Sequence, residues 1–95
     1  MDDKATSMPG SFSKDYYDRA NEAFASQNFQ KAVDKYGEAI AHDPFNVDYL
    51  CARAHAHLKL DEFEKAKTDA NKAIGNYLQR LFLKEDRNVL KHSQF

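Results

Sequence analysis

The chain has 95 residues and a mass of 10.9 kDa, which fits one small domain and excludes a second catalytic lobe, since independent domains usually run to about 100 to 150 residues. Fourteen basic and fifteen acidic side chains give a formal charge of -1 without a block of like charge, so neither nucleic acid nor a membrane surface is an expected partner. The single cysteine, Cys51, cannot form an internal disulfide, and no signal-peptide core or bilayer-length apolar run is present. We therefore expect a soluble protein of the cytoplasm, with the nucleus left open.

Residues 1–12 are expected to form a disordered tail. They mix charged residues with serine, proline and glycine and show no helical or strand periodicity. Regular spacing of apolar residues begins near Ser13, so we expect the ordered domain to start there.

Two amphipathic helices are expected next, at residues 14–26 and 29–42. Apolar or small residues recur there at intervals of three and four, namely at Tyr16, Ala20, Ala23, Phe24, Phe29, Ala32, Val33, Tyr36, Ala39 and Ile40. Asn28 is a candidate N-cap of the second helix. Asp43 is expected to end it, because the residue before Pro44 is disfavoured in the α region.

The same spacing restarts and predicts helices at residues 47–59 and 62–75. Its members are Val47, Leu50, Cys51, Ala54, Leu58, Phe63, Ala66, Ala70, Ala73 and Ile74. Asn46 is the candidate cap of the first of these helices. Asp61, with Glu64 three residues on, is expected to cap the second. No segment shows the alternation typical of a strand.

The chain repeats itself with an offset of 34 residues. Seven pairs are identical: Arg19/Arg53, Ala20/Ala54, Phe29/Phe63, Lys31/Lys65, Ala32/Ala66, Ala39/Ala73 and Ile40/Ile74. Small residues at three fixed places in both units allow two helices to approach closely, so each unit is expected to be one helical hairpin.

These residues resemble the tetratricopeptide repeat, a pattern of aromatic and small residues that ends in a proline. The first unit matches at Tyr16, Ala20, Phe24, Phe29, Ala32, Tyr36, Ala39 and Pro44, and the second at Leu50, Ala54, Leu58, Phe63, Ala66 and Ala73. In the second unit Ala70 replaces an aromatic residue and Leu78 replaces the proline. The resemblance covers residues 13–78 and implies an all-α fold in which two hairpins stack as part of an α-α superhelix.

Within that family, three segments look most like the repeat domain of the suppressor-of-G-two-allele-of-Skp co-chaperones. They are residues 20–24, 52–61 and 69–74. This resemblance implies a protein that acts with a heat-shock chaperone and with ubiquitin-ligase scaffolds, and it implies no cofactor.

Residues 79–95 do not continue the repeat and are expected to form a C-terminal capping helix, within a helix at 77–91. One apolar stripe, at Leu78, Leu81, Phe82 and Val89, is expected to cover the second hairpin, as the end of a stacked array must be covered. Leu83 and Leu90, seven residues apart, form a second stripe. Since this second stripe has no partner within one chain, we expect it to form the interface of a homodimer.

The resemblance also implies a concave groove lined by the first helix of each hairpin. The candidate partner-binding residues there are Tyr17, Asp18, Asn21, Phe24, Asp48, Cys51, Ala52, His55 and Lys59. Aromatic and polar groups on a rigid helix face suit an extended peptide or a partner helix. The alternative, that Phe24 is mostly core and the others are solvated, stays open.

Many tetratricopeptide co-chaperones hold an acidic peptide C-terminus in a clamp of lysine and asparagine residues. Asn21 matches the first asparagine, but Tyr17 and Ala52 stand where a lysine and a second asparagine are needed. A carboxylate without paired donors is costly to desolvate, so we expect such a peptide to bind weakly.

Enzymatic and metal-dependent functions are not expected. His55 and His57 lie two residues apart and point to opposite sides of a helix, without a third ligand at helical spacing. Cys51 has no base in a recognised arrangement and is expected to pack as a small apolar residue. The sequence thus predicts a non-enzymatic adaptor that links chaperone and ubiquitin-ligase assembly, and the alternative is a structural self-association module.

Overall fold

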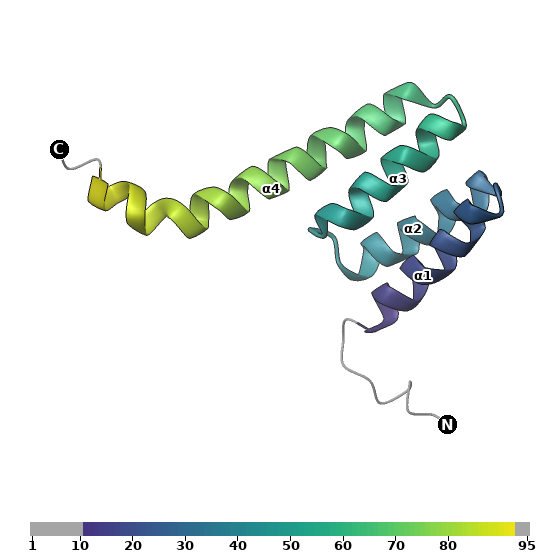
Figure 1. The fold of residues 1–95 in the computed structure, drawn as a ribbon, viewed down its shortest axis with the longest axis horizontal. Coiled ribbons are helices and arrows are strands. Elements are labelled where there is room, and N and C mark those ends of the chain that lie inside the picture. Colours follow the sequence, from purple (N-terminus) through teal and green to yellow (C-terminus); the bar gives the residue numbers. More distant parts are fainter. Residues whose placement is uncertain (1–10, 93–95) are drawn as a thin grey trace.

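The computed structural model describes residues 11–92, with the side chains of residues 12–83. It contains the helices α1 (Ser11–Ala25), α2 (Phe29–His42), α3 (Val47–Lys59) and α4 (Phe63–His92), and the described range holds no strand. Helices α1 to α3 and the first half of α4 lie side by side, and α4 then runs on away from them (Figure 1). The all-α class and the pair of helical hairpins are confirmed. Helix α1 begins two residues inside the expected tail, and the rest of that tail lies outside the described residues.

Both asparagines expected to cap helices do so. Asn28 Oδ1 accepts a hydrogen bond from the backbone amide of Lys31, and Asn46 Oδ1 accepts one from the amide of Tyr49. Each bond satisfies an amide in the first turn that has no partner within its own helix. Helices α2 and α3 consequently have the bounds that the sequence predicts.

The expectation that Asp61 and Glu64 cap α4 is wrong. Asp61 has a φ of 61°, and Gln27, its counterpart 34 residues earlier, has a φ of 66°. In both turns, the backbone amide of the next residue donates a hydrogen bond of 2.8 Å to the carbonyl oxygen five residues before it. This left-handed conformation closes the end of a helix. Asp61 therefore ends α3 and does not begin α4.

The two helices expected at 62–75 and 77–91 are one continuous helix, α4. Gly75 does not have positive φ, and the cost of about 1 kcal/mol for a glycine inside a helix is too small to break it. The first hairpin has Pro44 at the point where the second has Leu78. Proline pushes the preceding residue out of the helical region, whereas leucine does not. Helix α2 therefore ends and α4 continues.

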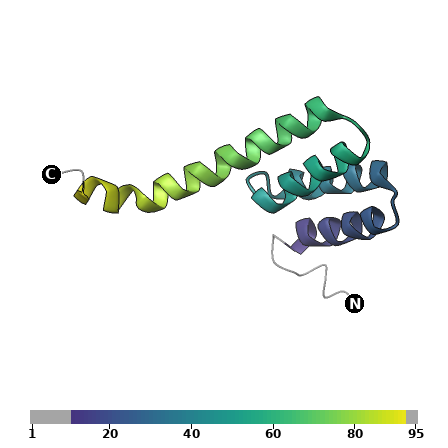
Figure 2. The ribbon, with the colours of Figure 1, turned by 45° about the horizontal axis from the view of Figure 1, so that its top comes forward.

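Because α4 does not turn back, the expected C-terminal cap over the second hairpin is absent from the described residues. Leu78 is 43% exposed and Phe82 is 67% exposed, while Leu81 is half-buried. Figure 2 shows the second half of α4 projecting from the hairpins in a second view. The prediction that this stripe covers its own hairpin is wrong for these residues, and the side chain of Val89 lies outside the described ones.

The core is built from the small residues that both hairpins share. Ala20, Ala32 and Ala39 are completely buried in the first hairpin, and their counterparts Ala54, Ala66 and Ala73 are buried in the second. Alanines at these places let helix axes approach closely, so larger side chains interlock around them. This close packing sets the spacing of α1 and α3, whose side chains form the face described next.

Candidate partner-binding face

Two ring contacts join α1 to α3 across the boundary between the hairpins. The ring of Tyr17 lies 4.8 Å from that of Tyr49, and the ring of Phe24 lies 4.8 Å from that of His55. Tyr17, Phe24 and Ala52 also pack against the buried core cluster. Tyr17 and Phe24 are half-buried on α1, and His55 is exposed on α3 in contact with Phe24, so these residues belong to a face between two helices. We call it the α1–α3 face.

The exposed part of α3 has a regular stripe. Asp48, Cys51, His55 and Lys59 follow each other at intervals of three and four residues, and all four are exposed. The expectation that Cys51 packs as a small apolar residue is wrong, because the buried side of α3 is occupied by Leu50 and its helical neighbours. An exposed thiol lies instead on the outer side of the helix.

The polar groups on α1 have defined partners. The hydroxyl of Tyr36 donates a hydrogen bond of 2.5 Å to Asn21 Oδ1, and this bond fixes the orientation of the Asn21 side chain. Burial, together with the neighbouring Tyr17, raises the pKa of Tyr36 above the ordinary value of a tyrosine. Asp18 forms an exposed ion pair of 3.3 Å with Lys14. The side-chain oxygen of Asn21 is therefore already used within the domain.

The arrangement has few donors for an acidic peptide. Tyr17 is held between Tyr36 and Tyr49, with ring separations of 5.8 and 4.8 Å, and Ala52 is half-buried against the core. Neither residue offers a cation or an amide side chain. The weak binding of an acidic peptide terminus stays a prediction, and the geometry gives it a reason.

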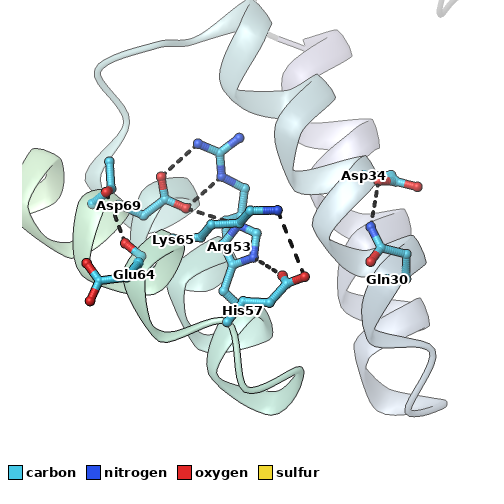
Figure 3. Close-up of polar contacts among 9 residues, drawn as sticks. Gln30, Asp34, Arg53, His57, Glu64, Lys65 and Asp69 are labelled. Carbon is cyan, nitrogen blue, oxygen red and sulfur yellow. Dashed lines mark hydrogen bonds and ion pairs between the residues drawn. The ribbon is translucent and has the colours of Figure 1, made fainter.

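The second hairpin contains a polar cluster that the sequence does not predict. Arg53 makes two hydrogen bonds of 2.7 Å to the carboxylate of Asp69, which is almost fully buried. His57 Nδ1 lies 2.7 Å from Glu62, and His57 Nε2 lies 3.7 Å from Asp69 (Figure 3). Arg53 and His57 lie four residues apart on α3 and Asp69 lies on α4, so no pattern within one helix pairs them. The cluster joins α3 to α4.

The two histidines differ as their spacing predicts. His55 is exposed on the α1–α3 face, whereas His57 is buried in the polar cluster. Among the residues that the structure describes, no three side chains of the metal-binding types are grouped so as to hold an ion.

Over the same part of the chain, no helix has both the length and the apolar character needed to cross a bilayer.

The residues expected at a dimer interface are only partly described. Leu83 is 66% exposed on α4, and the side chain of Leu90 lies outside the described residues. The homodimer through these two leucines stays a prediction.

The sequence is similar to known proteins that contain tetratricopeptide repeats. Residues 13–46 match the family model of the tetratricopeptide repeat. Protein SGT1 homolog of Oryza sativa subsp. japonica is 36% identical over 67 residues, which are 70% of this chain and 18% of that protein. Small glutamine-rich tetratricopeptide repeat-containing protein 2 of Saccharomyces cerevisiae is 41% identical over 56 residues, or 59% of this chain and 16% of that protein.

A third relative is named for ubiquitin transfer. E3 ubiquitin-protein ligase CHIP of Arabidopsis thaliana is 39% identical over 54 residues, which are 57% of this chain and 19% of that protein. The chain thus spans less than a fifth of the length of each of these three relatives.

Proposed function

Because the chain carries a tetratricopeptide repeat domain that resembles those of SGT-type co-chaperones, we propose that it is a non-catalytic adaptor that binds a chaperone through the α1–α3 face. The tetratricopeptide repeat is a protein-interaction fold. The observation that carries the proposal is the pair of ring contacts between α1 and α3, Tyr17 with Tyr49 and Phe24 with His55, with exposed polar residues around them. A rigid aromatic centre with a polar rim is typical of protein-binding surfaces.

The ligand is a folded surface or a helix of the chaperone and not its acidic terminus. The α1–α3 face combines the carboxylates of Asp18 and Asp48 with the cation of Lys59, so its charge is mixed. A mixed face pairs with a partner of mixed charge, whereas a peptide terminus with several carboxylates requires several donors. Within this proposal, the domain joins the chaperone to a ubiquitin-ligase scaffold, as the narrower family resemblance suggests.

The binding partner is tested with purified Hsp70 and Hsp90, each intact and with its C-terminal tail removed, by isothermal titration calorimetry. We expect at least one chaperone to bind, and removal of its tail to change the dissociation constant by less than about twofold, or 0.4 kcal/mol. Retained folding of the domain is checked by circular dichroism. A dependence on the tail, or no binding by either chaperone, contradicts the proposal.

The face is tested with a charge reversal of exposed residues. Changing both His55→Glu and Lys59→Glu should weaken chaperone binding about tenfold or more, because the rim then repels acidic groups of the partner and loses a cation. Lys31→Glu is the matched control, since Lys31 is equally an exposed helical residue but lies on α2. Equal losses in both variants would place the binding surface elsewhere.

A second candidate function is self-association. The observation in its favour is the row of exposed apolar side chains along α4, which lies apart from Tyr17 and Phe24. An adaptor that also pairs with itself presents two copies of its partner-binding face, so the two functions are compatible.

A further inference from the structure

The second hairpin supplies carboxylates to two of its own cations. Arg53 makes two hydrogen bonds of 2.7 Å to Asp69 (Figure 3), and Lys65 Nζ lies 4.0 Å from Glu62 Oε2. Helix α2 of the first hairpin lies against this site, because a Cβ atom at Gly37 would be 3.5 Å from the Arg53 guanidinium. The charges of the second hairpin are thus balanced within the chain.

The first hairpin has the same two cations without the two carboxylates. The corresponding pairs at the offset of 34 residues are Arg19/Arg53, Lys31/Lys65, Asn28/Glu62 and Lys35/Asp69. A neutral amide and a third cation therefore stand where the second hairpin has acidic groups. Among the residues whose side chains the structure describes, neither Arg19 nor Lys31 forms an ion pair, and both are exposed.

Arg19, Lys31 and Lys35 line a single cleft between α1 and α2. The cleft has a volume of about 530 Å³, and we call it the Arg19 cleft. The other polar side chains of its lining are Glu22, Ser26 and Asn28. Three cations and one carboxylate give the cleft a positive potential, which attracts anionic groups.

An alanine makes space for a ligand beside Arg19. In the second hairpin, His57 Nε2 lies 3.7 Å from the carboxylate of Asp69. Its counterpart in the first hairpin is Ala23, which lines the Arg19 cleft. The cleft thus keeps the arginine and lacks both side chains that surround the corresponding arginine of the second hairpin.

Lys35 is positioned by two neighbours on its own hairpin. Its Nζ lies 3.2 Å from Glu38 and 5.7 Å from the centre of the Tyr16 ring. Glu38 is exposed, so this ion pair is weak and leaves Lys35 as a cation of the cleft. A side chain that is already held in place loses less conformational entropy when a ligand binds.

The Arg19 cleft is separate from the α1–α3 face. Arg19, Glu22 and Ser26 follow at intervals of three and four residues on α1. At 100° per residue, this side of the helix is opposite to the side that carries Tyr17 and Phe24. The domain therefore has a second surface that a partner can reach while the α1–α3 face is occupied.

We propose that the Arg19 cleft binds an acidic segment of a partner protein, whose side-chain carboxylates take the places that Asp69 and Glu62 have in the second hairpin. Arginine and carboxylate groups pair through two parallel hydrogen bonds, as Arg53 and Asp69 do here. Three cations require more than one anionic group, so a run of acidic side chains complements the cleft better than one carboxylate. The segment needs no free C-terminus.

Fluorescence anisotropy with a short labelled peptide tests the proposal. The probe is rich in glutamate and aspartate and is amidated at its C-terminus, so it carries no terminal carboxylate. We expect a dissociation constant below about 100 μM at about 50 mM salt, and an increase of about threefold or more at about 200 mM salt. The matched peptide with glutamine and asparagine should bind at least about tenfold more weakly.

Variants at corresponding positions locate the site. Changing both Arg19→Gln and Lys31→Gln should raise the dissociation constant about tenfold or more, and circular dichroism checks that the domain stays folded. Lys65→Gln is the matched control, since Lys65 is the counterpart of Lys31 but lies beside Glu62. This control should change the constant less than about twofold.

A restored carboxylate tests whether a ligand takes the place of Asp69. Lys35→Asp should weaken peptide binding about threefold or more beyond Lys35→Gln, because the new carboxylate competes for Arg19. In an Arg19→Gln background, the two Lys35 variants should differ less than about twofold. The same difference in both backgrounds would show that Arg19 does not hold the carboxylate.

Three further outcomes overturn the proposal. They are no peptide binding at about 500 μM protein, equal losses in Lys65→Gln and in the double variant, and full displacement of the peptide by about 5 mM phosphate at constant ionic strength, which would assign the cleft to a small anion. Chaperone binding is measured separately with the double variant, which keeps every residue of the α1–α3 face. Failure of the Arg19 cleft and failure of the adaptor function are therefore distinguishable.

Discussion

The two hairpins have the same interior but different outer surfaces. Ala20 and Ala54, like the other paired alanines, are buried in both. Phe24 is half-buried against the next hairpin, whereas its counterpart Leu58 is 48% exposed. The comparison shows that the shared residues specify the hairpin itself, while the burial of its outer surface depends on the neighbouring element. Variants at matched positions separate these two contributions.

The largest expected effect comes from the polar cluster, which only the second hairpin has. Asp69→Ala should lower the free energy of unfolding by about 3 kcal/mol, because the change removes a buried acceptor from Arg53 and from the vicinity of His57. Lys35 is the counterpart of Asp69 in the first hairpin, and Lys35→Ala should cost less than about 0.5 kcal/mol. Urea denaturation of both variants measures the difference, and similar losses would show that the cluster has no special role in stability.

The polar cluster is also a feature that could not be predicted from the sequence. Helix bounds and the two asparagine caps follow from residues close together in the chain, so periodicity and side-chain chemistry predict them. The contact of Arg53 with Asp69 joins two helices, and no local pattern encodes it. The continuous α4 was missed for a related reason. Gly75 and Asn76 resemble a break, but the decisive difference is Leu78 at the place of Pro44.

For the candidate α1–α3 face, the sequence predicts which residues share a helix but not the environment of each side chain. Helical spacing places Tyr17 and Phe24 on one helix and His55 on another, and the structure brings Phe24 and His55 into ring contact. Exposure of Cys51 and the bond from Tyr36 to Asn21 depend on how the helices are rotated against each other. Rotation is set by packing of the whole domain, so spacing along one helix does not determine it.

Larger side chains at the buried alanines test the packing that both hairpins share. Ala20→Leu and Ala54→Leu should each cost about 1 to 3 kcal/mol, because added methylenes enter the close contact between the helices of a hairpin. Ala20 is completely buried and Ala54 is 8% exposed, so the first change should have the larger effect. The measurement is the urea midpoint. An unchanged midpoint for Ala54→Leu would show that the second hairpin is not closely packed there.

Truncation of the outer residues tests the difference between the hairpins directly. Phe24→Ala should cost about 2 kcal/mol, since Phe24 contacts both Phe29 and His55. Leu58→Ala should cost less than about 0.5 kcal/mol, because Leu58 is 48% exposed. Equal costs for both truncations would mean that another element covers Leu58.

The smallest expected effect concerns Tyr36, whose counterpart in the second hairpin is Ala70. Tyr36→Phe removes the hydrogen bond to Asn21 and should cost about 1 kcal/mol at neutral pH. Thermal denaturation measures this loss. A matched control is Tyr77→Phe on α4, where Tyr77 is 53% exposed, and this change should leave stability unaltered.

The free energy of unfolding at alkaline pH gives a second test of Tyr36, because it depends on whether the phenol is buried. The pKa of Tyr36 is raised in the folded state, chiefly by burial and then by Tyr17, so folding favours the neutral phenol. The stability that this phenol contributes is fully present below its unfolded pKa of about 10 and is lost as pH rises through the higher folded pKa. The gap in free energy of unfolding between the parent and Tyr36→Phe should therefore shrink above about pH 10. A gap that is constant or grows with pH would mean that the phenol does not titrate as a group buried against α1. The fixed position of Asn21 on the α1–α3 face would then need another cause.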